Sequence, residues 1–183
     1  MSRWKIYDFL FGEEKSTPYF NDTTVVDFKI YTPEFMKRVS EVTESGAAIF
    51  MTGSYVGSDQ IIPNDSTAIK FAGSVLHFSP RTDHAVRSGN VYTTDYANPS
   101  FTGKFDFNTG FSDLIYTAEA PDAIEPAGKG AVCSFRYSEN NSSAGVAYKG
   151  SYRTVILGFP FETIVSGTQR DILMKQVLNF LDK

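Results

Sequence analysis

The sequence predicts an α/β protein: a three-layer α/β/α sandwich whose mainly parallel sheet has an antiparallel extension near the carboxyl end. Three observations support this prediction. Residues 47–52 form an uninterrupted apolar run, which is typical of a strand buried on both faces of a parallel sheet. Residues 32–46 and 168–181 have apolar positions at helical spacing. Residues 131–138 and 145–149 alternate as strands around a short polar turn, which indicates an antiparallel pair.

Length and composition predict one domain covering residues 1–183, since 183 residues with 42% apolar and 21% charged side chains can bury a substantial core. Residues 1–22 are irregular, with no strand feeding a helix. We therefore expect the chain to begin partway into a larger polypeptide, whose other domains would be partners.

Charge and patterning exclude several classes of function. A net charge of -4 without a Lys/Arg run argues against nucleic acid as a partner. No apolar run approaches the ~20 residues of a membrane span, and no signal peptide is visible at the start of this chain. The single cysteine, Cys133, allows neither an internal disulfide nor a paired-cysteine metal site, and no motif indicates a cofactor.

The elements of the first half follow from local signals. Residues 24–30 predict a short edge strand, and the helix after it has Thr32 as N-cap, Pro33 at its first position and Gly46 at its end. The remaining expectations are a helix starting at residues 64–67, polar strand-like pieces over 79–92, a loop over 95–113, a strand over 114–117 and a turn over 121–126.

The final third is predicted to end with a strand and a helix. Residues 152–157 form an apolar strand, and Gly158 to Glu162 follow it directly. The closing helix has an apolar face formed by Ile172, Leu173, Val177, Leu178 and Leu181.

The turn after the buried strand, Gly53-Ser54-Tyr55-Val56-Gly57, has the glycine-bracketed shape of a strand-to-helix nucleophile elbow. In an active enzyme the central position holds Ser or Cys, exposed at the tip of the turn. Here that position holds Tyr55. The frame of a catalytic elbow is present without the usual nucleophile.

Three segments together resemble the class I glutamine amidotransferase-like fold, which is flavodoxin-like: AAIFMTGSYVGSD, the strand YRTVILGFPFE and the closing helix QRDILMKQVLNFL. More narrowly, SGAAIFMTGSYVGSD, SFTGKFDFN, APDAIEPAG and VILGFPFETI look like the carboxy-terminal region of large secreted Bacteroidetes proteins. Those proteins are labelled xanthan lyase or golvesin-like and are carbohydrate-associated. The resemblance covers about residues 30–181, and it implies an extracytoplasmic location and carbohydrate as a partner.

The resemblance also implies a triad of Cys in the elbow and His and Glu after a later strand. In this sequence the Cys position holds Tyr55, and Phe159 precedes Pro160 where the His would stand. The Glu position is Phe161, or Glu162 if one residue has been inserted. Neither phenylalanine nor a neutral tyrosine performs thiolate–imidazole chemistry, so the triad is predicted to be lost.

Ser54 and Ser58 are the alternative nucleophiles. A hydrolytic site would need His77 or His84 as base, with Asp59 or Asp83 as the group that orients it. The competing interpretation is that both serines bond turn amides. The spacing of His77, Asp83 and His84 matches no standard metal motif, so no metal site is predicted.

The remaining side chains each allow two interpretations. Tyr55 either fills the former pocket or forms a platform for a ligand, and Asp59 either caps the helix after the elbow or binds a sugar hydroxyl. Glu162 follows a central strand where open α/β sheets bind ligands, or else it bonds a loop amide or pairs with Arg153 or Arg170. The aromatic loop 95–113 either stacks on sugar rings or covers the sheet.

The leading hypothesis is a non-catalytic amidotransferase-like accessory domain, structural or ligand-binding, of a carbohydrate-associated protein. The first alternative is a hydrolase, or a polysaccharide-degrading domain, with a rebuilt site. The second is a protein-interaction module, dimeric through an exposed sheet edge. The expected catalytic candidates are Ser54, Ser58 and Glu162, and the expected ligand-binding residues are Gly53, Ser54, Tyr55, Asp59, Phe159 and Glu162.

Overall fold

The computed structural model describes residues 5–20, 22–61 and 64–182. In chain order its strands are β1 Ile6–Leu10, β2 Thr17–Tyr19, β3 Asp22–Asp27, β4 Ala48–Thr52, β5 Phe78–Thr82, β6 Asn90–Thr93, β7 Lys104–Asp106, β8 Ala123–Pro126, β9 Ala131–Tyr137, β10 Ser143–Lys149 and β11 Arg153–Leu157. The helices are α1 Pro33–Glu44, α2 Ser58–Ile61, α3 Ser66–Phe71, a π-helical continuation Ala72–Leu76, a 3-10 turn Phe161–Thr163 and α4 Gly167–Leu181.

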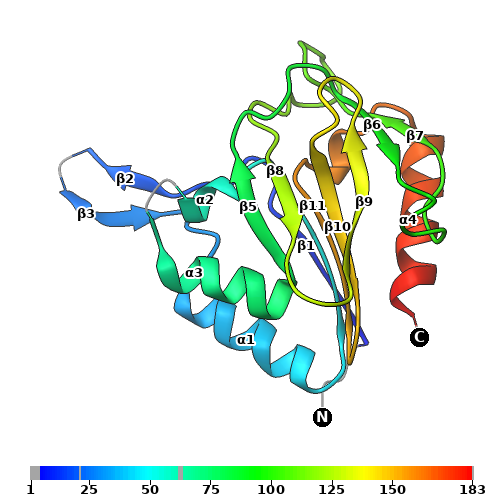
Figure 1. Ribbon diagram of the computed structural model, residues 1–183. Coiled ribbons are helices and arrows are strands. Elements are labelled where there is room, and N and C mark those ends of the chain that lie inside the picture. Colours follow the sequence, from blue (N-terminus) through cyan, green and yellow to red (C-terminus); the bar gives the residue numbers. More distant parts are fainter. Residues whose placement is uncertain (1–4, 21, 62–63, 183) are drawn as a thin grey trace.

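The main sheet has seven strands in the order β1-β4-β11-β10-β9-β6-β7 (Figure 1). β4 pairs in parallel with β1 and with β11, while the four remaining neighbours are antiparallel. The predicted α/β class and its antiparallel extension are therefore confirmed. The sheet is not mainly parallel, because only the two ladders of β4 are parallel and the other four ladders are antiparallel.

Helices pack on both faces of this sheet. Against one face, α1 and α3 bury Val39 and Phe71 with Ile49 of β4. Against the other face, α4 buries Leu173 and Val177 with other strand residues. Figure 1 shows α1 and α3 on the side opposite α4. β5 and β8 form a separate antiparallel pair, and β2 and β3 form a hairpin that projects away from the sheet.

Local capping explains the helix boundaries that the sequence predicted. The Thr32 side chain accepts a hydrogen bond from the Phe35 backbone N–H at 3.2 Å, and Pro33 opens α1 as expected. Asp65 accepts from the backbone N–H groups of Thr67 and Ala68, which starts α3. These signals lie within a few residues of each helix, so they can be recognised without the tertiary structure.

Two expectations about the first 30 residues were wrong. Within the expected irregular lead-in 1–22, Ile6–Leu10 form β1, a parallel edge strand beside β4, while residues 1–4 and 21 lie outside the described residues. The strand expected at 24–30 is β3, and it pairs with β2 in the hairpin instead of forming an edge of the main sheet. In both cases the strand is defined by a partner distant in sequence, which a local pattern does not reveal.

Three further expectations need correction. Residues 114–117 form no strand. The Asn108 side-chain amide donates hydrogen bonds to the carbonyls of Ile115 and Tyr116, and these bonds hold the stretch as a loop. The turn expected at 121–126 contains β8, which pairs with β5. The loop expected at 95–113 contains β7.

The apolar face of α4 was placed slightly wrong. Its buried side chains are Leu173, Val177, Phe180 and Leu181. Ile172 and Leu178 are 46% and 44% exposed, because the stripe that faces the sheet is narrower than the run of apolar residues. In the described part of the chain, no helix has the length and apolar character that crossing a membrane requires.

Candidate functional site

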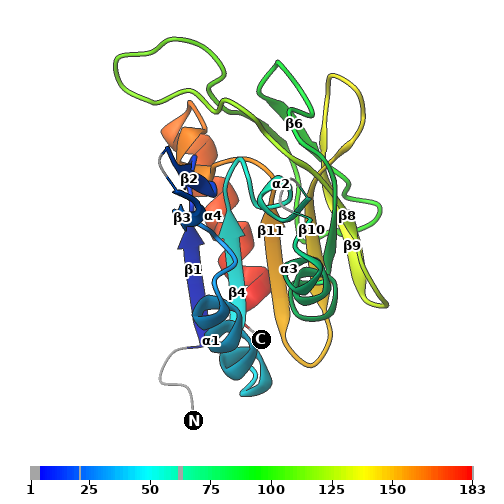
Figure 2. The same ribbon diagram turned by 90° about the vertical axis from the view of Figure 1, so that its left-hand side faces the viewer.

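The strands β1, β4 and β11 are parallel neighbours, so their carboxyl ends lie side by side at the same end of the sheet (Figure 2). The β1–β4 ladder continues past both strands, since Phe11 donates its backbone N–H to Thr52 and Ser54 donates to Gly12, each at 2.9 Å. The elbow after β4 therefore lies beside the loop after β1. This is the edge at which open α/β sheets bind ligands.

Tyr55, at the nucleophile position of the elbow, is only 5% exposed. Its hydroxyl accepts a hydrogen bond from the Lys15 ammonium at 3.0 Å, and the same ammonium lies 4.5 Å from the ring centroid. The ring packs in the core shared with α1 and α3. This environment favours the interpretation that Tyr55 fills space in the core over the interpretation that it forms a platform for a ligand.

Phe159 and Phe161 lie in a different part of the interior from Tyr55. Phe159 is fully buried and stacks on Phe107 with ring centroids 4.8 Å apart, while Phe161 packs edge-on against Phe50. These two rings belong to the core on the α4 side, whereas Tyr55 belongs to the opposite core. The aromatic side chains at the positions that a triad would occupy therefore pack into two different cores.

The two elbow serines bond carboxylates. The fully buried Ser54 donates its hydroxyl to Glu13 Oε1 at 2.5 Å, and Ser58 donates to Asp122 Oδ2 at 3.1 Å. His77 Nε2 lies 3.0 Å from the Tyr152 hydroxyl instead. His84 lies 3.2 Å from the Asp83 carboxylate, and both of those side chains are exposed. The Ser–His pair of a rebuilt hydrolase does not form among the described residues.

Asp122 holds the elbow in place from the loop before β8. Its Oδ2 accepts the backbone N–H groups of Gly57 and Ser58, each at 2.7 Å, as well as the Ser58 hydroxyl. Burial raises the pKa of this carboxyl to about 8, although the hydrogen bonds from Gly57 and Ser58 lower the pKa in part. The sequence analysis missed Asp122, because it lies 64 residues from Ser58 in a stretch expected to be a turn.

Asp59 does not cap a helix, and this expectation was wrong. It lies inside α2, and its two oxygens accept the backbone N–H groups of Ser16 at 2.5 Å and Ile30 at 3.0 Å. Its side chain is buried, and desolvation raises its pKa. Asp59 thus binds the segments on either side of the β2–β3 hairpin to the helix after the elbow. Because this side chain is buried and both of its oxygens are bonded, it is not available to a sugar hydroxyl.

Glu162 lies in a shallow groove of about 460 Å³ beside the elbow, lined by Leu10, Phe11, Gly12, Glu13, Tyr116 and Glu162. The Tyr116 hydroxyl donates to Glu162 Oε1 at 2.5 Å. Neither expected arginine reaches Glu162: Arg153 donates to the Phe180 carbonyl and Arg170 to the Ile164 carbonyl. Glu162 is thus the one predicted ligand-binding side chain that borders an open groove.

Glu13 is the second carboxylate of this groove. Its Oε1 accepts the Ser54 hydroxyl, whereas its Oε2, like the Oε2 of Glu162, is shielded from solvent and has no hydrogen-bond partner among the described residues. Desolvation raises the pKa of Glu13, and the nearby Glu119 carboxylate adds to this rise. Nothing in the local sequence pattern around Glu13 or Tyr116 indicates that they join Glu162.

The groove is electrically negative. Desolvation and the charge of Glu162 both raise the pKa of Asp8, which lies on β1, and desolvation and the bond to Glu162 raise the pKa of the Tyr116 phenol. In the described part of the chain, no three His, Cys, Asp or Glu side chains gather as a metal site would require. The chemistry that this arrangement offers is hydrogen-bond acceptance beside an apolar and aromatic wall.

Comparisons with known proteins place the chain by fold. No family model matches it, and no curated protein does. A solved structure, the cytoplasmic protein STM3548 from Salmonella typhimurium, matches with a TM-score of 0.52 and 14% sequence identity, over 98% of this chain and 72% of that one. At this identity the match shows similarity of fold alone.

This match contradicts one expectation. The resemblance drawn from sequence motifs implied an extracytoplasmic location, whereas the protein with the similar structure is a cytoplasmic one. We therefore withdraw the extracytoplasmic assignment.

Proposed function

We propose that this protein is a non-catalytic, amidotransferase-like domain that binds a neutral, hydroxyl-rich ligand such as a carbohydrate in the groove between Glu13, Tyr116 and Glu162. In this proposal the domain is a curled variant of the three-layer α/β/α amidotransferase-like fold. The observation that carries the proposal is the pair of carboxylates at the groove. Each has one oxygen bonded to a protein hydroxyl and a second oxygen without a donor.

Carboxylate oxygens without donors favour a ligand that supplies O–H groups. A buried acceptor left unpaired costs about 1–3 kcal/mol. Because both Oε2 atoms are shielded from solvent, a ligand hydroxyl gains that amount only where a rotation of the carboxyl group turns the oxygen toward the groove. Leu10 is 51% exposed and Tyr116 43% exposed, and they offer an apolar edge and a ring on which the face of a sugar can lie. Sites for small polar ligands commonly combine apolar walls with a few placed polar groups.

The charge of the groove selects among carbohydrates. Asp8, Glu13 and Glu162 lie close enough to affect one another or the Tyr116 phenol electrostatically, so an anionic sugar would add like charge. We therefore expect neutral oligosaccharides to bind in preference to uronate-containing ones.

The test is a binding titration of the whole chain with neutral and uronate-containing oligosaccharides, followed by amide chemical shifts. We expect saturable shifts at the loop after β1 and around Tyr116 with at least one neutral sugar. Glu162→Gln should weaken that binding about tenfold or more, because a charged acceptor is worth roughly 1.5–3 kcal/mol. Glu44→Gln removes an equal charge from an exposed side chain at the end of α1 and serves as the matched control.

Two results would contradict the proposal. One is that no oligosaccharide of the panel shifts the groove resonances. The other is that Glu162→Gln and Glu44→Gln bind with the same affinity as the unsubstituted protein. The elbow holds Tyr55 in place of a thiol, and its two serines bond carboxylates, so the proposal expects no hydrolysis of glutamine. Measurable turnover of glutamine would contradict the non-catalytic part of the proposal.

A further inference from the structure

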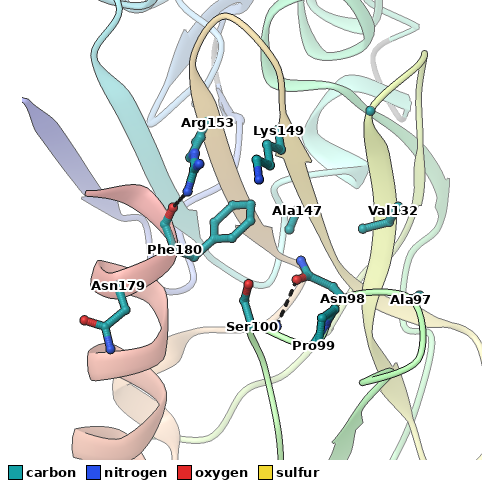
Figure 3. A pocket seen from close by; sticks show the side chains of 11 residues that line it. Ala97, Asn98, Pro99, Ser100, Val132, Ala147, Lys149, Arg153, Asn179 and Phe180 are labelled. Carbon is teal, nitrogen blue, oxygen red and sulfur yellow. Dashed lines mark hydrogen bonds between the residues drawn. The ribbon is translucent and has the colours of Figure 1, made fainter. Parts of the chain in front are cut away.

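A second cavity lies near the start of β11, on the side of the sheet that α4 covers, and is separate from the elbow groove. It has a volume of about 440 Å³ and lies between the β10–β11 hairpin, the start of β9, the loop 97–100 and the last turn of α4 (Figure 3). This volume is within the range of about 300–1,000 Å³ found for small-molecule sites. Nothing in the proposed carbohydrate site uses it.

The floor of the cavity is apolar and is set by a small side chain. Ala147 of β10 lies opposite Val132 of β9 and Val155 of β11, and it is 1% exposed. The Phe180 ring, which is 6% exposed, forms the side toward α4. Because Ala147 has only a methyl side chain and its neighbours are larger, space remains above it that a larger side chain would occupy.

One wall is a loop held by hydrogen bonds within itself and to β9. The buried Asn98 donates its amide to Ser134 Oγ at 3.1 Å and accepts the Ser100 backbone N–H at 3.2 Å. The Asn98 backbone N–H is itself bonded to the Thr94 carbonyl at 2.9 Å. The wall is thus fixed by its own contacts without a ligand.

Two cations face this space from paired positions. Lys149 and Arg153 are direct register partners at the end of the β10–β11 hairpin (Figure 3). Arg153 donates to the Phe180 carbonyl, and its guanidinium lies 5.3 Å from the Phe180 ring centroid. Neither cation forms an ion pair within the described residues, and none of the described side chains that line the cavity is acidic.

We propose that this cavity binds a small organic anion, with a phosphate or carboxylate group placed against Lys149 and Arg153 and an apolar body on Ala147, Val132 and Phe180. Two unneutralised cations at a partly enclosed site attract an anion despite the net charge of -4 of the whole chain. The Phe180 ring and the Ala147 methyl exclude water from the body of the ligand. The shape and charge of the cavity thus favour an amphipathic anion over an inorganic ion.

The test uses phenyl phosphate, benzoate and the uncharged benzyl alcohol as probes, titrated into the full chain by calorimetry and amide chemical shifts. We expect phenyl phosphate, benzoate or both to bind saturably, with shifts at residues 97–100 and 147–153. Benzyl alcohol should bind at least about tenfold more weakly, because it lacks the charge-assisted contacts. Comparison of the two anions distinguishes a phosphate ligand from a carboxylate ligand.

Lys149→Glu is the decisive variant, because Lys149 is exposed and its replacement disturbs no core packing. It should weaken binding of the preferred anion about tenfold or more. Lys104→Glu makes the same change of net charge on β7, away from the cavity lining, and should leave the affinity unchanged. The proposal is overturned if neither anion binds, if benzyl alcohol binds as tightly as they do, or if the two variants lose the same affinity.

Discussion

At the scale of single residues, Asp122 decides the shape of the elbow. Its Oδ2 satisfies the backbone N–H groups of Gly57 and Ser58, which follow Tyr55 in the turn. The Tyr137 hydroxyl lies within hydrogen-bond distance of the carbonyls of Asp122 and Gly158, at 2.8 and 3.1 Å. One carboxyl and one phenol thereby join the elbow to the end of β11.

The raised pKa of Asp122 predicts a pH-dependent stability. Because the folded-state pKa of about 8 lies above the ordinary value of 3.8, the folded protein holds a proton that the unfolded chain releases. This contribution is complete below pH 3.8 and is lost as the pH rises through 8. Urea unfolding should therefore give a lower free energy of unfolding at about pH 9 than at about pH 6.

Substitutions at Asp122 isolate this contribution from that of other buried acids. Asp122→Asn keeps an oxygen acceptor and removes the ionisation, so its stability should change less between the two pH values than that of the unsubstituted protein. Asp122→Ala leaves two buried N–H groups unpaired and should cost about 2–4 kcal/mol at pH 6. Its cost should be smaller at pH 9, where the unsubstituted protein has lost the contribution of the protonated carboxyl. An Asp122→Asn variant that retains the full pH dependence would show that another group is responsible.

The sequence could identify site residues only where their position follows from the adjacent strand. The sequence identified Tyr55 and Glu162 as central, because each stands at a fixed distance from the end of a strand. It missed Glu13, Tyr116 and Asp122, because these come from loops whose positions depend on the tertiary fold. The pairings of Ser54 and Ser58 with carboxylates are long-range contacts of this kind.

At the scale of elements, the loop before β8 passes against the end of β11 with no room for a side chain. A Cβ atom at Gly158 would lie 2.1 Å from the Asp122 backbone oxygen and 3.0 Å from its carbonyl carbon. Asp122 donates its backbone N–H to the Gly158 carbonyl at 2.7 Å across this approach. The absence of a side chain at position 158 thus permits the contact that places Asp122 at the elbow.

Gly158→Ala should therefore destabilise the protein by about 3 kcal/mol or more, because backbone atoms must move apart to admit the methyl group. Gly73→Ala is the matched control: its added Cβ meets nothing within 4 Å, and the residue lies in a helical segment. There the substitution should raise stability by about 0.5–1 kcal/mol. Equal thermal midpoints for the two variants would contradict the close approach.

The elements that could be predicted are those with their own start and stop signals. The sequence located α1, α3 and α4 by their caps and spacing, and β9, β10 and β11 by two hydrophobic runs around a polar turn and a third beyond it. The strand-like pieces expected over 79–92 correspond to β5 and β6, whereas β8 escaped prediction because its partner β5 is distant in sequence. β1 did so because only its alignment with β4 makes it a strand.

At the scale of the whole molecule, one sheet carries two hydrophobic cores. Adjacent residues of the central strand β11 contribute to different cores: Ile156 belongs to the core covered by α1 and α3, and Leu157 belongs to the core covered by α4. Both side chains are fully buried. The α/β class could be predicted because it depends on the patterns of single segments. The curl and the mixed strand order depend on which segments pair.

Because the two cores share β4 and β11, we expect them to unfold as one cooperative unit. Ile156→Ala and Leu157→Ala should each lower the free energy of unfolding by about 2–5 kcal/mol, the usual range for such a truncation in a packed core. In either variant, hydrogen exchange should show amide protection falling together in α1 and α4, although only one of these helices contacts the altered core. If protection fell only in α1 for Ile156→Ala and only in α4 for Leu157→Ala, the two faces would be independent units. The sheet would then separate two independently stable cores, and the position of the elbow after β4 would not depend on both of them.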